Sequence, residues 1–92
     1  MKETIRVQVQ YMKEGELAVV YSPSLEISGY GKTLLEAEKD FHQAVKIFIE
    51  ETTANHTFEK ALQALGWKRI DRHWQPQVEI ISSKTENIAI PA

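Results

Sequence analysis

The sequence predicts an α+β fold: an antiparallel-rich sheet of three to four strands, with one long and one short helix packed on one face. Two observations lead to this class. In the first third of the chain apolar and polar side chains alternate, as in strands with one buried face. Over residues 34–52 apolar side chains recur at three- and four-residue steps, as in an amphipathic helix. The predicted element order is β-β-β-α-α-β.

The long helix is predicted to begin at a capping box. Thr33 is followed three residues later by Glu36, so the Thr33 hydroxyl is expected to accept from the Glu36 amide and the Glu36 carboxylate from the Thr33 amide. The apolar positions that follow form a single stripe, which consists of Leu34, Ala37, Phe41, Ala44, Val45, Phe48 and Ile49. We expect this stripe to cover the sheet.

Three strands are predicted before this helix. Residues 5–11 alternate strictly between apolar and polar, and residues 17–21 follow after a polar turn that contains Gly15, which favours an antiparallel hairpin. Pro23 ends the second strand, because proline has no N–H to donate to a ladder. A third, short strand is predicted over 26–30.

After the long helix the sequence predicts a short helix over 58–65, ended by Gly66 in the left-handed conformation of a C-terminal cap. Such a cap would set Trp67 back against Leu62. Residues 68–74 favour a strand or a tight hairpin.

The C-terminal part of the chain is predicted to be extended. Residues 77–81 have the composition of a strand, and residues 82–92 form an extended tail or an extra strand. Ile88 and Ile90 alternate with polar or small residues in this tail. Three interpretations remain open, namely pairing within the chain's own sheet, pairing with a second chain, and disorder.

Composition narrows the class of protein. Ninety-two residues with 42% hydrophobic and 26% charged side chains indicate a single domain over 1–92, small enough that a homo-oligomer, dimer or larger, is expected. A net charge of −2 gives no general attraction to nucleic acid or anionic lipid. The absence of cysteine excludes disulfides and thiol chemistry. No apolar run has the length of a signal peptide or a membrane span, so a cytoplasmic protein without membrane contact is expected.

No pattern of catalytic residues stands out, and we predict a protein that is not an enzyme and has no metal or cofactor. The first predicted strand has no acid between Glu3 and Glu14, whereas a two-metal nuclease site needs converging carboxylates. His42 follows Glu38 by four residues on the same helix face, but no third ligand has a suitable spacing. A solvent-exposed polar helix face explains this pair.

The residues around the helix start resemble the HicB-like antitoxin family of bacterial toxin-antitoxin pairs. The matching positions are Pro23, Gly31, Thr33, Glu36 and Ala37, the apolar stripe over 41–49, and the turn of Leu65, Gly66 and Trp67. The resemblance covers residues 5–67 and implies a partial ribonuclease H-like fold that binds and blocks a small RNA-cleaving toxin. Serine follows Pro23 where the family usually has glycine.

Many members of that family carry a separate C-terminal DNA-binding element. Here only 18 residues follow Trp74, and they predict a strand and a tail. DNA binding is therefore not carried over to this chain.

The leading hypothesis is a non-catalytic protein-binding module whose partner is a small toxin-like protein. The candidate partner-binding residues are Arg6, Gln8, Gln10, Trp74, Ile88 and Ile90. An alternative is a nucleic-acid-binding protein that uses the basic and aromatic segment 67–74 through Lys68, Arg69, Arg72 and Trp74. For the two tryptophans of this segment, closing the edge of a core is the other interpretation. For the chain as a whole, the third hypothesis is an orphan structural domain of unknown role.

Overall fold

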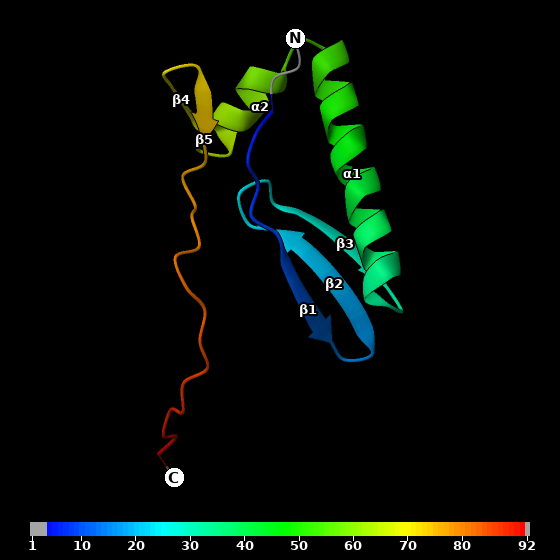
Figure 1. Cartoon of the computed structure of the whole chain (residues 1–92), viewed down its shortest axis with the longest axis vertical. Coiled ribbons are helices and arrows are strands. Elements are labelled where there is room, and N and C mark those ends of the chain that lie inside the picture. Colours follow the sequence, from blue (N-terminus) through cyan, green and yellow to red (C-terminus); the bar gives the residue numbers. More distant parts are fainter. Residues whose placement is uncertain (1–3, 92) are drawn as a thin grey trace.

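The computed structural model describes residues 4–91 and confirms the α+β class and the order β-β-β-α-α-β (Figure 1). A small two-stranded sheet is added after the second helix. The elements are β1 Gln10–Glu14, β2 Leu17–Ser22, β3 Ile27–Gly31, α1 Leu34–Ala54, α2 Phe58–Ala64, β4 Lys68–Ile70 and β5 His73–Gln75. No helix in the described range is both long and apolar enough to span a membrane.

The main sheet is antiparallel with strand order β1-β2-β3, and α1 covers one of its faces (Figure 1). Gly15 has a φ of 61° in the two-residue turn between β1 and β2, where a left-handed conformation suits glycine. Val20 on β2 lies opposite Gly29 on β3, and both face the helix. The first core cluster consists of Ala18, Val20, Ala37 and Phe41, so the predicted apolar stripe of α1 does cover the sheet.

The capping box forms with one change. Thr33 Oγ1 accepts the Glu36 amide at 3.1 Å, as predicted. The Glu36 carboxylate accepts the amide of Lys32 at 2.9 Å instead of that of Thr33. Both bonds hold the start of α1 against the end of β3.

A second core cluster lies beyond the end of the sheet, where α2 packs with the β4–β5 hairpin (Figure 1). It consists of Leu25, Leu62, Trp67 and Trp74. Gly66 has a φ of 90°, and the Trp67 amide donates to the Leu62 carbonyl at 2.9 Å, so the predicted left-handed cap is present and places Trp67 beside Leu62. The predicted tight hairpin turns through Asp71 and Arg72, both with positive φ.

Two predicted strands are not formed as strands in the described residues. Residues 5–9 are extended, but β1 begins only at Gln10, because its partner β2 ends at Ser22 and Pro23 turns the chain away. Residues 77–81 form no strand, because their contact with the neighbouring segment runs through the Gln8 side chain and not through a backbone ladder. The expected alternation of half-buried and exposed side chains nevertheless persists over 5–9.

Candidate interaction surface

The two edges of the main sheet differ in whether side chains of the chain occupy their outward-facing backbone groups. At the β3 edge, Asp40 on α1 accepts the amide of Tyr30 at 2.9 Å. Just after β3, Glu36 accepts the amide of Lys32 in the same way. Acidic side chains that occupy outward-facing amides prevent another strand from pairing there. The β3 edge is therefore closed.

At the opposite edge, no strand in residues 4–91 pairs with the outer side of β1 or with the extended residues before it. Residues 4–14 are called the open edge below. β1 pairs only with β2, and within the described chain no hydrogen bond reaches the backbone of residues 4–9. Ile5 and Val7 pack against the second core cluster and Val9 against the first, so this segment is fixed by its side chains. An ordered strand with free backbone donors and acceptors is a template for a further strand.

The sheet face away from α1 is also apolar. Met12, Val19 and Tyr30 lie in one row across the three strands, with Leu17 near the turn. Val19 is buried to 5% exposure by its neighbours, whereas Met12 and Tyr30 are 41% and 51% exposed. The row therefore forms an uncovered apolar strip on the outer face.

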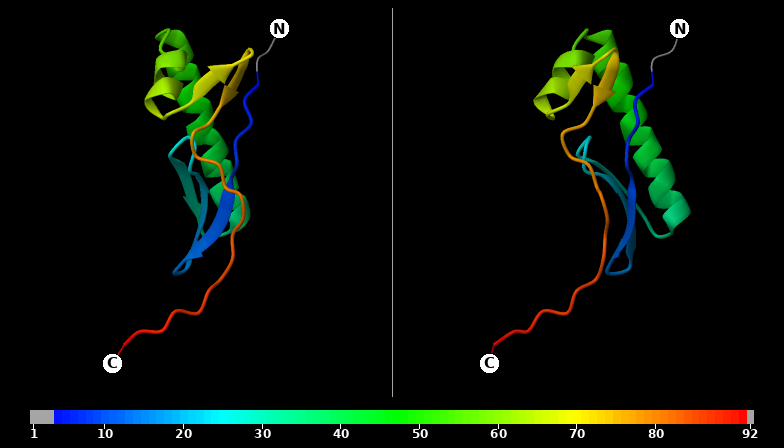
Figure 2. Two further views of the ribbon diagram at one scale, coloured as in Figure 1. Left: turned by 90° about the vertical axis from the view of Figure 1, so that its left-hand side faces the viewer. Right: turned by 60° about the vertical axis from the view of Figure 1, so that its left-hand side comes forward.

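The C-terminal tail, residues 77–91, runs extended along the side of the sheet that faces away from α1, meets Gln8 at Ile80, and then leaves the body of the molecule (Figure 2). Ile88 and Ile90 are 80% and 90% exposed and belong to no strand. Of the three interpretations for these residues, pairing within the chain's own sheet is not observed. An extended tail is what the structure shows.

One residue connects the tail to the open edge. Gln8 donates from Nε2 to the Ile80 carbonyl at 3.0 Å and accepts the Ile80 amide on Oε1 at 2.6 Å. Of the predicted contact residues, Arg6 and Gln8 are exposed and Gln10 is half-buried. The structure thus places these three on the open edge, and brings Gln8 to the tail.

Trp74, the remaining predicted contact residue, is placed elsewhere. It is 7% exposed and packs with Trp67 and Leu62 in the second core cluster. The interpretation in which both tryptophans close a core is confirmed by this burial. Its ring offers little surface to a partner protein or to a nucleic acid base.

The other residues of the basic segment are on the surface, but one of them is engaged. Arg69 Nη1 lies 3.1 Å from Glu59 Oε1, and its guanidinium carbon lies 5.8 Å from the Trp74 ring centroid. Lys68 and Arg72 are exposed, and Arg72 lies in the hairpin turn beside Asp71. Glu59 beside Arg69 and Asp71 beside Arg72 lower the positive charge that this segment presents to phosphates.

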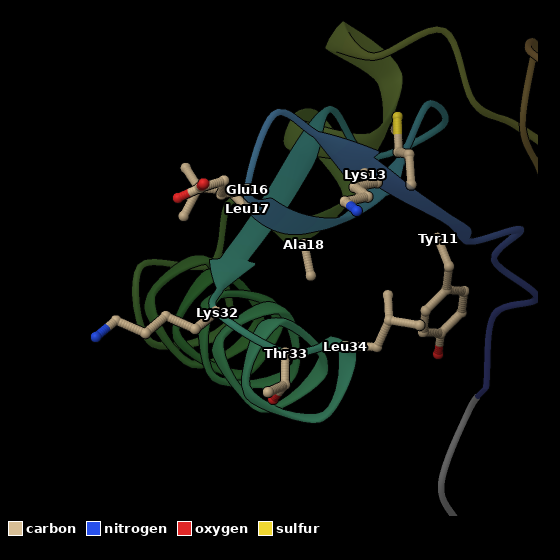
Figure 3. Close-up of a pocket in the computed structure, with 9 residues that line it drawn as sticks. Tyr11, Lys13, Glu16, Leu17, Ala18, Lys32, Thr33 and Leu34 are labelled. Carbon is tan, nitrogen blue, oxygen red and sulfur yellow. The ribbon is translucent and has the colours of Figure 1, made fainter.

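A shallow hollow of about 370 Å³ lies between the β1–β2 turn and the start of α1. Figure 3 shows the Tyr11 ring beside Leu34 at one side of it and the Lys32 side chain extended away from it. The Tyr11 hydroxyl donates to Glu38 Oε2 at 2.9 Å, and this hydrogen bond, with smaller contributions from burial and the Glu38 charge, raises the pKa of the phenol. Within residues 4–91 no three acids or histidines are grouped to share a metal ion.

The outer strip was not anticipated from the sequence. Its signal was present in β2, where five consecutive apolar residues, Leu17 to Tyr21, replace the alternation expected of a strand with one solvated face. Such a run predicts apolar side chains on both faces of the sheet. Met12 and Tyr30 extend that second face onto the neighbouring strands.

Together these features define the class of protein as a small α+β domain. It has one closed and one open sheet edge, an apolar outer strip, and a tail that is exposed beyond Ile80. Comparisons with protein-family models, with curated proteins and with solved structures found no match to this chain.

Proposed function

We propose that this chain is a non-catalytic protein-binding module, similar in role to a toxin-antitoxin antitoxin, that sequesters a small RNA-cleaving protein. The observation that carries the proposal is the outer face of the main sheet, where Met12, Tyr30 and Leu17 are exposed around the buried Val19. Contiguous apolar side chains on a face that no element covers are typical of protein interfaces. The open edge beside this strip adds backbone groups that a partner strand would satisfy.

The charge of the chain supports a basic partner. Helix α1 carries five acidic residues, Glu36, Glu38, Asp40, Glu50 and Glu51, against Lys39 and Lys46. Proteins that cleave RNA need positive charge for the phosphate backbone. The acidic helix lies on the other face of the sheet from the strip, and its charge has the sign that attracts a basic partner over long range.

The proposal is tested by purifying the tagged chain gently from a cell that encodes it and weighing the complex by native mass spectrometry. We expect a small basic protein at fixed stoichiometry. After the two proteins are separated, the partner alone should cleave RNA, and addition of the chain at an equal molar amount should stop the cleavage.

Two variants show whether the outer strip makes the contact. Met12→Asp places a charge in the strip and should abolish inhibition of the partner. Leu35→Asp places the same charge on an exposed apolar residue of α1, away from the strip, and should inhibit as the wild type does. Inhibition by both variants would overturn the placement of the interface.

Other results would overturn the function itself. Co-purification of nucleic acid, with retention on an oligonucleotide column that falls steeply with salt, would favour binding through Lys68 and Arg72. A chain that carries no partner protein from its own cell would indicate an orphan structural domain.

A further inference from the structure

We propose that this chain forms a homodimer by exchanging its C-terminal tails, with the tail of each copy lying as a strand along the open edge of the other. The inference goes beyond the proposed function, because it concerns the assembly of the chain with itself. It assigns a role to the two features that the fold leaves unpaired, the tail at 77–91 and the open edge at 4–14.

The tail extends beyond its own domain. Ile80 is held by Gln8, and the ten residues from there to Ile90 span about 33 Å at the rise of an extended chain. The molecule is 55 Å long, and the tail runs along this longest axis until its C-terminal end lies beyond the β1–β2 turn (Figure 1). Both views in Figure 2 show the C-terminal end pointing away from the body. Ile88 and Ile90 therefore lie too far from their own core to be buried by it, but a second molecule could cover them.

The tail touches the segment before β1 at one point. The Gln8 side chain takes both the N–H and the C=O of Ile80, so this contact recognises the backbone of the tail and not its side chains. The backbone of residues 4–9 itself has no hydrogen bond within the described chain, so it is available to an incoming strand. A contact that forms within one chain is available between two identical chains, which is the basis of exchange dimers.

The exposed area fits a stable dimer. The chain exposes 7845 Å², roughly 2400 Å² more than the average folded monomer of its mass. A standard interface buries about 800 Å² per partner, and permanent dimers bury more. The radius of gyration is 16.1 Å, against about 12 Å for a compact domain of this length. Exchange of the tails would lower the exposed area per chain, because each tail would be buried against the other copy.

The asymmetry of the two edges makes a closed dimer the expected assembly. Asp40 and Glu36 occupy amides at the β3 edge, so each chain has one edge for one incoming tail. A reciprocal exchange then uses every tail and every open edge, and it leaves no site for a third chain. Filaments would need a second open edge.

Measuring the molecular mass of the purified chain in solution tests whether it is a dimer. We expect sedimentation equilibrium to give the mass of two 10.6 kDa chains at micromolar concentration. The chain ended after Ser82, and the variant Ile88→Lys with Ile90→Lys, should each give the mass of one chain. The matched control, Ser83→Lys with Thr85→Lys, adds the same charge to the same tail but keeps the isoleucines, and should remain a dimer.

The receiving edge is tested separately. Lys13→Pro removes a backbone donor on the outward side of β1, since the register points the Lys13 N–H away from β2, and should give a monomer because proline has no N–H for an incoming strand. Lys13→Ala removes only the side chain and should remain a dimer. Helix content measured by circular dichroism should be unchanged in all variants, since α1 and α2 take no part in the exchange.

Three results would overturn the exchange. They are a full-length chain that stays monomeric up to several hundred micromolar, a dimer that survives truncation after Ser82, and a dimer unaffected by Lys13→Pro. A monomer whose tail becomes protected from proteolysis only when an RNA-cleaving partner is added would assign the tail to that partner. Because the measurement uses the isolated chain, its failure is distinct from a failure of the proposed function.

Discussion

Gly29 on β3 lies directly against the backbone of Phe41 on α1. A Cβ atom built on Gly29 would collide with the Phe41 nitrogen and lie 2.5 Å from the Ala37 carbonyl oxygen. The absence of a side chain at this position lets the helix approach the sheet closely, so that Ala37 and Phe41 reach Val20. The proposed binding surface depends on this contact, because it fixes which face of the sheet is covered.

Gly29→Ala should lower the free energy of unfolding by about 2 to 3 kcal/mol, because the helix must move away from the sheet to accommodate the methyl group. Urea denaturation followed by circular dichroism measures the change. The control is Gly15→Ala, where no atom lies within 4 Å of the added methyl and the only cost is the positive φ, about 1 kcal/mol. If both variants lose the same free energy of unfolding, the close contact at Gly29 does not set the distance between α1 and the sheet.

The indole of Trp67 joins the second core cluster to the loop before β3. Its Nε1 donates to the Ser24 carbonyl at 2.8 Å, and the ring is 2% exposed. Trp67→Phe removes this buried bond and part of the ring, and should cost about 2 to 4 kcal/mol in thermal or urea unfolding. Trp74→Phe, in the same cluster, loses no such hydrogen bond and should cost about 1 to 2 kcal/mol.

The elements specified by local chemistry were predictable from the sequence. Thr33 and Glu36 start α1 through short-range hydrogen bonds, and Gly66 ends α2 because its φ of 90° suits glycine. These signals operate within a few residues of the chain. The α+β class follows from them together with the two periodicities, and it is what the structure shows.

The elements that need a distant partner could not be predicted in the same way. Residues 5–9 and 77–81 have strand-like composition, yet in the described chain neither is paired through its backbone with another strand. Strand propensity describes a side chain that suits a pleated surface, and it does not supply the neighbour. For the same reason the candidate site was predicted only in part, since the closed edge at Asp40 and the exposure of Met12 depend on packing.

The pKa of the Tyr11 phenol should show whether its hydrogen bond to Glu38 on α1 forms in solution. The hydrogen bond to Glu38 favours the protonated phenol, so the pKa of Tyr11 is raised above its ordinary value near 10. The stabilisation is therefore complete below pH 10 and is lost as the pH rises through the raised pKa. The phenolate absorbance of the wild type minus that of Tyr11→Phe isolates this group.

In that difference titration, Glu38→Ala should shift the midpoint of Tyr11 down toward the ordinary value. The control is Glu51→Ala, which removes an exposed acid from the C-terminal part of α1. A midpoint that is the same in the wild type and in Glu38→Ala would show that the two side chains do not meet in solution.

Asp40 should protect the β3 edge from association. Asp40→Ala leaves the Tyr30 amide without its acceptor and exposes a second open edge, so the variant should form species larger than the wild type. Light scattering during slow heating measures this. Asp40→Asn retains an oxygen acceptor and should associate much less than Asp40→Ala. If both variants associate equally, the charge of the aspartate protects the edge and its hydrogen bond does not.

The contact between Gln8 and Ile80 should control how firmly the tail is held. Gln8→Ala removes both hydrogen bonds to the Ile80 backbone, so the amide of Ile80 should exchange with solvent more rapidly. Because both groups are on the surface, the free energy of unfolding should change by less than about 1 kcal/mol. Hydrogen exchange followed by nuclear magnetic resonance separates these two effects.

Gln8→Glu distinguishes the two hydrogen bonds of this contact. A carboxylate still accepts the Ile80 amide but has no proton for the Ile80 carbonyl, so the exchange rate of that amide should lie between those of the wild type and Gln8→Ala. Arg6→Ala, on the same exposed side of the segment, should leave the rate unchanged. If Gln8→Ala and the wild type exchange alike, the tail is held by contacts other than this amide.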